Sequence, residues 1–347
     1  TNDRRRSLPE ATRTAEQNGA RAPRTGSQKR SSRSRPFRLF MGKKLHCIKT
    51  TNPNASKGAQ MRATVLVDNE AQGLCENEWG LSILIEHREH ATLLDAGASG
   101  LFAENARKLG VDLAAVNVAA LSHAHYDHSD GFDAFFQVND TAKLFVAASA
   151  RENCYDIEDG KLCYIGVSHG LFARHAHRIE YVSRPAEIAP DVWALPHTTP
   201  NLAEKGAKAG MFTTEERAPE NPVTKRPTTD EPLDESPAAE GLMAEESTSE
   251  KSVAENPDPA TLRPDDFSHE QSIVVKLDEG LAVFSSCSHC GPDVVMAEVH
   301  QFMPDQPIRA LIGGFHLYDT PDEEVRALAG RMKNEGIELA YTGHCTG

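Results

Sequence analysis

The stretch His123-Ala124-His125-Tyr126-Asp127-His128 is the most informative part of this chain, because it places three imidazoles and one carboxylate within six residues. It follows the apolar run 117–122, so we expect a strand that ends in a metal-binding loop. Histidines at i and i+2 can share one ion, which leaves the aspartate and the last histidine for a second ion. The alternative, a histidine-rich surface loop that binds nothing, does not account for four ligand-type residues at so close a spacing.

Strands and helices are predicted on both sides of this loop. Three strand-type runs precede it, at 63–67, 80–86 and 91–95. In the second half of the chain, strands at 272–277, 281–285 and 308–312 alternate with helices at 293–302 and 322–334. Two blocks of strands, each followed by helices and with metal-type residues at strand ends, predict an α/β (α+β) fold. The arrangement expected is a four-layer αββα sandwich.

The HxHxDH motif is that of the metallo-β-lactamase superfamily, and the chain resembles this superfamily over much of its length. Leu93-Leu94-Asp95-Ala96-Gly97 looks like the superfamily's strand-ending Asp-x-Gly, in which Asp95 supports the metal loop. A narrower resemblance is to the subgroup of 7,8-dihydropterin-6-methyl-4-(β-D-ribofuranosyl)aminobenzene-5'-phosphate synthases and related metallo-hydrolases. The stretches that carry it are 65–69, 78–82, 286–291, 313–317 and 343–347. The resemblance implies an enzyme, either a metal-dependent hydrolase or a transferase.

Three later histidines, His289, His316 and His344, also follow predicted strands. Such strand ends converge on one face of a sandwich, so we expect all three near the metal loop. By resemblance, His289 completes the ion position of the first two motif histidines, and His344 completes that of Asp127. The implied metal ligands are therefore His123, His125, Asp127, His128, His289 and His344. His316 is read as a proton donor or phosphate contact, and Asp127 as both ligand and proton acceptor, which makes these two the predicted catalytic residues.

Two ligand assignments stay open in the sequence. His269 lies where other branches of the superfamily have their third histidine ligand, so it competes with His289. Cys287 lies where many relatives have a metal-bridging aspartate. We expect Cys287 to support the site as a buried thiol, with a thiolate ligand as the alternative.

Four polar residues near the amino-terminal strands, Asp68, Asn69, Glu78 and Ser82, match the pattern of the subgroup. The resemblance implies that they contact the substrate. Polar residues at strand ends are also typical turn formers, which is the competing explanation.

Two segments have compositions that disfavour a packed core. Residues 1–45 contain thirteen basic and three acidic residues, so 1–60 is predicted to be a disordered basic extension of the domain at 61–347. Residues 201–266 contain sixteen acidic and seven basic residues and are predicted to be a disordered, Pro-rich insert. The whole chain has a net charge of −14, so the remaining body is acidic and disfavours nucleic acid as a partner. We expect a small-molecule substrate, and the oligomeric state is not predicted.

Zinc is the metal that this donor set favours, because the loop lacks the glutamate of oxygen-reducing di-iron relatives. Hydrolysis of a small phosphorylated or pterin-like metabolite is the first functional hypothesis. The alternatives are a condensing transferase that releases diphosphate and a non-catalytic, metal-containing module that binds a ligand. No apolar run reaches the ~18 residues of a membrane span. Seven cysteines without regular spacing suit a reducing compartment, so we expect a cytoplasmic protein. The ending at Gly347 suggests a carboxyl terminus shorter than that of relatives.

Overall fold

The computed structural model describes residues 38–41, 47–50, 61–70, 73–215 and 257–346. The chain divides into two compact units, Thr1–Arg35 and Pro36–Gly347, and every described residue lies in the second.

The first sheet has seven strands in the order β10-β7-β6-β5-β4-β3-β2. Their bounds are β2 Cys47–Thr50, β3 Met61–Val67, β4 Ser82–His87, β5 His90–Leu94, β6 Val118–Ala120, β7 Lys143–Ala147 and β10 Ile179–Val182. Strands β2 to β5 are antiparallel neighbours, and β5, β6, β7 and β10 are parallel. The turn between β4 and β5 is tight because Arg88 and Glu89 both have positive φ, which matches the twist of a two-residue hairpin.

The second sheet also has seven strands, in the order β1-β18-β17-β16-β15-β12-β11. Their bounds are β1 Arg38–Met41, β11 Ala186–Ala189, β12 Val192–Pro196, β15 Gln271–Leu277, β16 Gly280–Phe284, β17 Ile308–Gly313 and β18 Leu339–Thr342. Strands β11, β12, β15 and β16 are antiparallel, whereas β16, β17, β18 and β1 are parallel. Strands β16 and β17 have almost entirely buried residues, as expected of strands covered on both faces.

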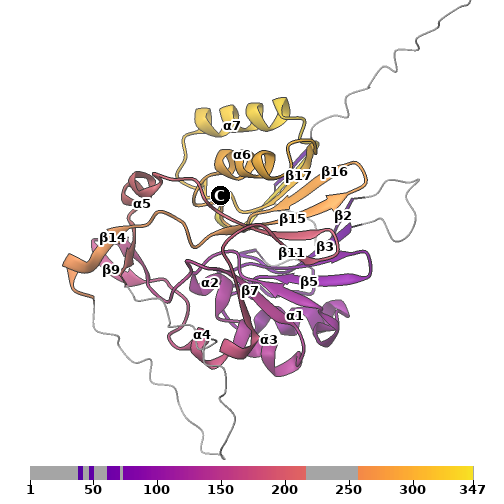
Figure 1. Ribbon diagram of the computed structural model, residues 1–347, viewed down its shortest axis with the longest axis horizontal. Coiled ribbons are helices and arrows are strands. Elements are labelled where there is room, and N and C mark those ends of the chain that lie inside the picture. Colours follow the sequence, from indigo (N-terminus) through magenta and orange to yellow (C-terminus); the bar gives the residue numbers. More distant parts are fainter. Residues whose placement is uncertain (1–37, 42–46, 51–60, 71–72, 216–256, 347) are drawn as a thin grey trace, which may run out of the picture. The chain divides into compact units, whose positions relative to one another are not determined.

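Helices cover the outer face of each sheet (Figure 1). Helices α1 (Leu101–Leu109) and α3 (Phe132–Val138) pack on the first sheet, and α6 (Pro292–Phe302) and α7 (Asp322–Asn334) pack on the second. A third apolar cluster fills the space between the sheets, with Ile83 from one side and Phe284 from the other. The predicted four-layer αββα sandwich is therefore confirmed. No described helix combines the length and the apolar character that crossing a membrane requires.

A four-stranded sheet that the sequence did not predict lies beside the sandwich. Its order is β14-β13-β8-β9, with bounds β8 Cys154–Glu158, β9 Lys161–Tyr164, β13 Met211–Thr214 and β14 Leu262–Pro264. The remaining short helices are α2 (Tyr126–Ser129), α4 (Leu171–Arg174) and α5 (Ala203–Ala209).

This sheet corrects the bounds of the predicted disordered insert at 201–266. Helix α5 and strand β13 occupy its first part, and β14 occupies its last part. The average composition of the segment does not indicate these elements. Strand β13 is held by backbone pairing with β8 and β14, which does not depend on an apolar composition. The central part, 216–256, lies outside the described residues.

The predicted disordered extension at 1–60 was also too long. Residues 38–41 form β1 against β18, and residues 47–50 form β2 against β3. Edge strands such as these gain order from backbone hydrogen bonds to a formed sheet, which needs no amphipathic pattern of their own. The rest of 1–60 lies outside the described residues.

Candidate metal centre

Strand ends from both sheets bring the predicted ligands together. Strand β6 leads into the metal loop, and β16, β17 and β18 lead into the segments of His289, His316 and His344. Strand β6 is parallel to β5 and β7, and β16, β17 and β18 are parallel to one another, so the carboxyl ends of the three late strands lie at one edge of their sheet. In the structure the rings of His289 and His344 lie next to those of His123 and His128, and the ring of His316 lies next to that of His289.

His123, His125 and His289 form a first candidate position for an ion. The ligand atoms of the three lie within 4.8 Å of one another, and all three side chains are buried. The Nε2 atoms of His123 and His125 and both ring nitrogens of His289 have no hydrogen-bond partner. Buried imidazole nitrogens without partners are costly, so this set fits a bound cation.

The same three histidines are held in the neutral form that binds metal. Burial, followed by the neighbouring histidines, lowers the pKa of His123 and of His289 well below the ordinary value. Burial and His269 lower the pKa of His125 to about 3. Each imidazole therefore has a free lone pair at neutral pH.

Asp127, His128 and His344 form the second candidate position. The Nε2 atoms of His128 and His344 are 3.2 Å apart, and Asp127 Oδ2 lies 3.6 Å from the first and 3.4 Å from the second. Burial alone would lower the pKa of His128, but Asp127 and Asp95 outweigh it and raise the value to about 9. A cation is thus favoured at this point, and a divalent ion fits the same three atoms.

Asp95 and Ser122 orient the loop histidines from behind. Asp95 Oδ2 accepts from His128 Nδ1 at 2.8 Å and from the Ser122 hydroxyl at 2.7 Å. Because the Ser122 hydroxyl donates to Asp95, its oxygen accepts from His123 Nδ1 at 2.8 Å. Both histidines therefore present Nε2 to the candidate ion positions, and Asp95 contacts both His128 and Ser122 from behind.

Asp68 and Asn69 lie behind His344. The Nδ1 of His344 donates to Asn69 Oδ1 at 2.9 Å, and the backbone N–H of His344 donates to Asp68 Oδ1 at 3.0 Å. Gly80 N–H also donates to Asn69 Oδ1, at 3.1 Å. These contacts orient a candidate ligand, and the implied substrate contact of Asp68 and Asn69 stays a prediction.

Glu78 and Ser82 likewise hold the chain that follows β5. Glu78 accepts hydrogen bonds from the backbone N–H groups of Ala98 and Ser99. Ser82 is fully buried, and its hydroxyl donates to the Asp95 carbonyl at 2.8 Å. Ser82 therefore supports the chain at Asp95 in this structure, and its implied contact with a substrate stays a prediction.

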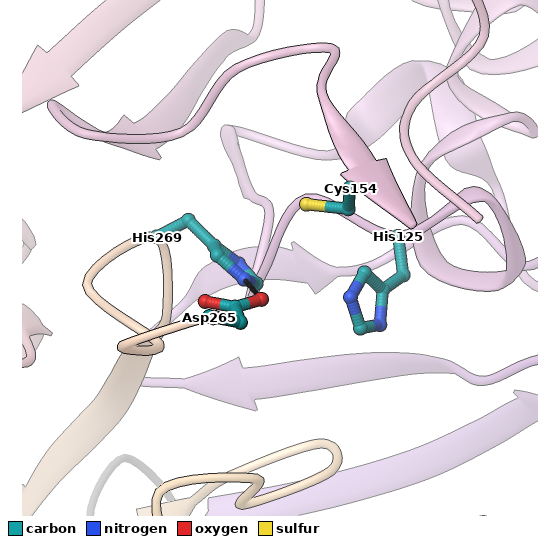
Figure 2. Close-up of side chains that lie close together, drawn as sticks. All are labelled: His125, Cys154, Asp265 and His269. Carbon is teal, nitrogen blue, oxygen red and sulfur yellow. Dashed lines mark hydrogen bonds and ion pairs between the residues drawn. The ribbon is translucent and has the colours of Figure 1, made fainter. Parts of the chain in front are cut away.

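His269 lies beside the first position in a cluster with His125, Cys154 and Asp265 (Figure 2). Its Nε2 donates to Asp265 Oδ2 at 2.9 Å, and its Nδ1 accepts from the backbone N–H of Ala124 at 3.2 Å. Both nitrogens are thus occupied, whereas both nitrogens of His289 are without partners. The geometry favours His289 as the third histidine ligand and gives His269 the task of fixing the backbone between His123 and His125.

Two thiols and His316 complete the cluster. The ring of His316 is tilted against that of His289, with ring centroids 4.4 Å apart, and its buried Nδ1 has no hydrogen-bond partner. The Sγ of Cys287 lies 3.2 Å from His128 Nε2. Burial would raise the pKa of the Cys345 thiol, but contacts with Cys287 and His316 outweigh this and lower it well below its ordinary value. The thiols of Cys287 and Cys345 therefore lie next to the second candidate ion position.

Backbone strain is concentrated at the cluster. Asp95, Ser288, His316 and His344 all have φ between 47° and 59°, the left-handed region that costs a non-glycine residue roughly 1–2 kcal/mol. Each follows a strand of the sandwich. Strain of this kind at strand ends is a signal of a functional site that the sequence alone does not display.

Several buried residues that sequence reasoning missed hold the His289 loop. The carboxylate of Glu270 accepts from the backbone N–H groups of His289 and Cys290, at 2.8 and 3.0 Å. His197 Nε2 lies 3.6 Å from Cys290 Sγ, and its Nδ1 donates to Glu298. No motif marks Glu270 or Glu298, because their partners lie far away in the sequence.

Replacing Glu298 by Gln is expected to lower the free energy of unfolding by roughly 1–3 kcal/mol at pH 7, since the buried carboxylate also accepts from Thr198, Thr199 and His197. Burial would raise the pKa of Glu298, but the His197 hydrogen bond outweighs it and lowers the value from 4.5 to about 2. Because the pKa of Glu298 is lower in the folded than in the unfolded protein, its carboxylate stabilises the fold above pH ~4.5. This contribution is lost as the pH falls toward 2. Urea denaturation of both proteins at several pH values should show the difference shrinking across that window; a constant difference would contradict the assignment.

Two exposed aromatic rings flank the cluster and were also missed. Trp79 is 54% exposed and its ring lies 5.5 Å from that of His344. Tyr318 is 60% exposed and its ring lies 5.0 Å from that of His316. Large exposed aromatic side chains beside a buried polar cluster are typical of a ligand site.

Comparison with known proteins agrees with this geometry. Residues 80–204 match the family described as the Metallo-beta-lactamase superfamily. A crystal structure described as Tm1679, a metal-dependent hydrolase of the beta-lactamase superfamily, is 26% identical, with a TM-score of 0.60, and the match covers 83% of this chain and 89% of that one. The predicted resemblance to the metallo-β-lactamase superfamily is therefore confirmed, and the protein shares the fold of this metal-dependent hydrolase.

A narrower match is to the 7,8-dihydropterin-6-methyl-4-(beta-D-ribofuranosyl)-aminobenzene-5'-phosphate synthase of Methanocaldococcus jannaschii. It is 31% identical over 83 residues, which are 24% of this chain and 28% of that protein. The match thus spans less than a third of the relative's length.

Proposed function

We propose that this protein is a hydrolase that acts on a small phosphorylated or pterin-like metabolite. It would use two divalent metal ions, for which zinc is our first choice. The observation that carries the proposal is the pair of ligand sets described above. One set has four buried ring nitrogens without partners, and the other brings three acceptor atoms within 3.6 Å of one another. Neutral imidazoles with one carboxylate are the donors that zinc prefers.

The first set, His123, His125 and His289, would hold one ion, and Asp127, His128 and His344 would hold the other. Divalent ions supply a water of lowered pKa and polarise a carbonyl or phosphoryl oxygen. Asp127 would accept a proton from a water molecule at the second ion position, because its Oδ2 lies 3.6 Å from His128 Nε2 and 3.4 Å from His344 Nε2. His316, whose Nδ1 is without a partner, is placed to donate a proton to the leaving group.

Two features of the chain support a small-molecule substrate. The net charge of −14 disfavours nucleic acid and other large polyanions. Trp79 and Tyr318 offer apolar surface beside the cluster for a ring-bearing metabolite. We propose no nucleic-acid or membrane partner.

A condensing transferase is the second candidate, and the match to the M. jannaschii synthase favours it. In that reaction the same ions would hold a diphosphate leaving group, and Asp127 would receive a proton from the attacking aminobenzene compound. Incubation with a dihydropterin diphosphate and an aminobenzene ribofuranosyl phosphate separates the two candidates. Condensation product supports the transferase, and cleavage of phosphodiester, thioester or lactone probes alone supports the hydrolase. Tight metabolite binding without turnover on any of these would indicate a ligand-binding module instead.

Elemental analysis of protein purified without chelator is expected to find close to two ions per chain, because two ligand sets are present. His123→Ala and His128→Ala should each lose at least one ion while keeping the melting transition of the sandwich. His300→Ala is a suitable control, since His300 pairs with Glu335 on the helices and is remote from the strand ends. Unchanged metal content in both loop variants would overturn the metal centre.

A further inference from the structure

Two thiols from different strand ends meet at the second ion position. Cys287 follows β16 and Cys345 follows β18. The ligand atoms of Cys287, His344 and Cys345 all lie within 4.8 Å of one another. Both cysteines are free, and each is only 3% exposed.

The backbone around Cys345 holds its side chain against the Cys287 segment. Cys345 Sγ lies 3.7 Å from the Cys287 carbonyl oxygen. Gly314 leaves the necessary space, because a Cβ at this position would lie 2.7 Å from Cys345 Sγ. The closeness of the two sulfurs is thus fixed by packing on both strands.

The sulfur of Cys287 also lies where it could bind a metal ion together with the loop histidines. Its Sγ is 3.2 Å from His128 Nε2, and the ligand atoms of His123, His128 and Cys287 lie within 4.8 Å of one another. Thiolate sulfur is a strong ligand for zinc. A disulfide, in contrast, requires the two sulfurs to approach to about 2.05 Å, and neither is then a thiolate.

We propose that Cys287 and Cys345 are a modification site for hydroperoxides, and that a metal ion at the Asp127–His128–His344 position protects them by also taking the Cys287 thiolate as a ligand, which a disulfide would remove. This inference rests on the proposed metal centre. Oxidation of the pair would in turn release the ion from the second position.

In the proposed formation of the Cys287–Cys345 disulfide, a hydroperoxide is the oxidant. One thiolate attacks the peroxide, forming an S–O bond and breaking the O–O bond, so a sulfenic acid and one water or alcohol result. The second thiol attacks that sulfur, the S–O bond breaks, and a second water leaves with the thiol's proton. Two thiols lose two electrons in total, and the peroxide gains them.

The test uses the full chain in two forms, freed of metal by chelator and reloaded with Zn²⁺. Each form is treated with hydrogen peroxide, and free thiols, the intact mass and the cross-linked peptides are measured over time. Metal-free protein should lose two of its seven thiols and yield a Cys287–Cys345 peptide. At free Zn²⁺ about ten times the dissociation constant the rate should fall roughly tenfold, since only the metal-free fraction reacts.

Matched variants separate this pair from other cysteines. Cys345→Ser should form no cross-link, and Cys287→Ser provides the same test from the other strand. Cys290→Ser should still form it, because Cys290 is equally buried in the same loop but its thiol faces His197. A Co²⁺ titration gives an independent readout, since a thiolate-to-cobalt charge-transfer band should be weaker in Cys287→Ser and should disappear after peroxide treatment.

Failure of this inference can be told apart from failure of the metal centre. A protein that binds two Zn²⁺ ions but forms no Cys287–Cys345 link, or forms it equally fast with Zn²⁺ bound, contradicts the thiol pair alone. A link between Cys287 and Cys290 would contradict it as well. If the protein binds no metal, the proposed function fails, and with it the protective role of the ion.

Discussion

Asp127→Asn is expected to reduce turnover by roughly 10²- to 10⁴-fold while leaving the fold intact. The amide has the size of the carboxylate but carries no charge and cannot take a proton. Asp127 Oδ2 lies within 3.6 Å of His128 Nε2 and His344 Nε2, so the substitution also weakens the second ion position. The measurement is kcat/KM on whichever probe the wild-type protein turns over, together with metal content and the melting temperature of both proteins.

Asp130→Asn is the matched control for this experiment. Asp130 lies three residues further along the same loop, and its carboxylate accepts from the backbone N–H and the hydroxyl of Ser168, at 3.0 and 2.6 Å. It should affect stability more than turnover. Equal activity of wild type and Asp127→Asn on every substrate would mean that the metal loop is not the catalyst.

The position of the candidate site could be predicted from the sequence because strand ends obey a simple rule. The runs before His123, His289 and His344 were recognisable as strands, and parallel strands deliver their carboxyl ends to one edge of a sheet. Helix α7 was also predicted with the bounds that the structure shows. Strong periodicity and clear end signals made these elements readable.

The contacts behind the ligands could not be predicted, since they join residues far apart in the chain. The hydrogen bond from Ala124 to His269 spans 145 residues, and that from His344 to Asn69 spans 275. Spacing indicates that a polar residue follows a strand, but not which way it turns. For this reason Asp68 and Asn69 were expected at the substrate and are found behind His344.

The four-stranded sheet was missed for a related reason. Strands β9, β13 and β14 are three or four residues long, which is too short for a periodic pattern. Strands β9 and β13 pair with β8, and β14 pairs with β13 across the segment 216–256. The composition predicted a disordered insert at 201–266. In the structure, a helix and a strand precede the segment 216–256 and another strand follows it.

His269 and His289 are the two candidates for the third histidine ligand, and sequence spacing does not distinguish them. The hydrogen bonds of their ring nitrogens do. His269 uses Nε2 for Asp265 and Nδ1 for Ala124, so binding an ion would break one of these hydrogen bonds. His289 would lose nothing, because neither of its ring nitrogens has a partner. Its backbone N–H is instead fixed by Glu270, which holds the ring in place for an ion.

His289→Ala is therefore expected to weaken Zn²⁺ binding at the first position by more than about 100-fold, whereas His269→Ala should cost only the 10–100-fold typical of a residue that supports a ligand. Competition with a chromophoric chelator measures both affinities under metal-limited conditions. His269→Asn adds a sharper control, because the amide oxygen can still accept from the Ala124 N–H and should restore part of the affinity. If His269→Ala proves more damaging than His289→Ala, and Asn restores nothing, the ligand role passes to His269, and the unpartnered nitrogens of His289 must then serve the substrate.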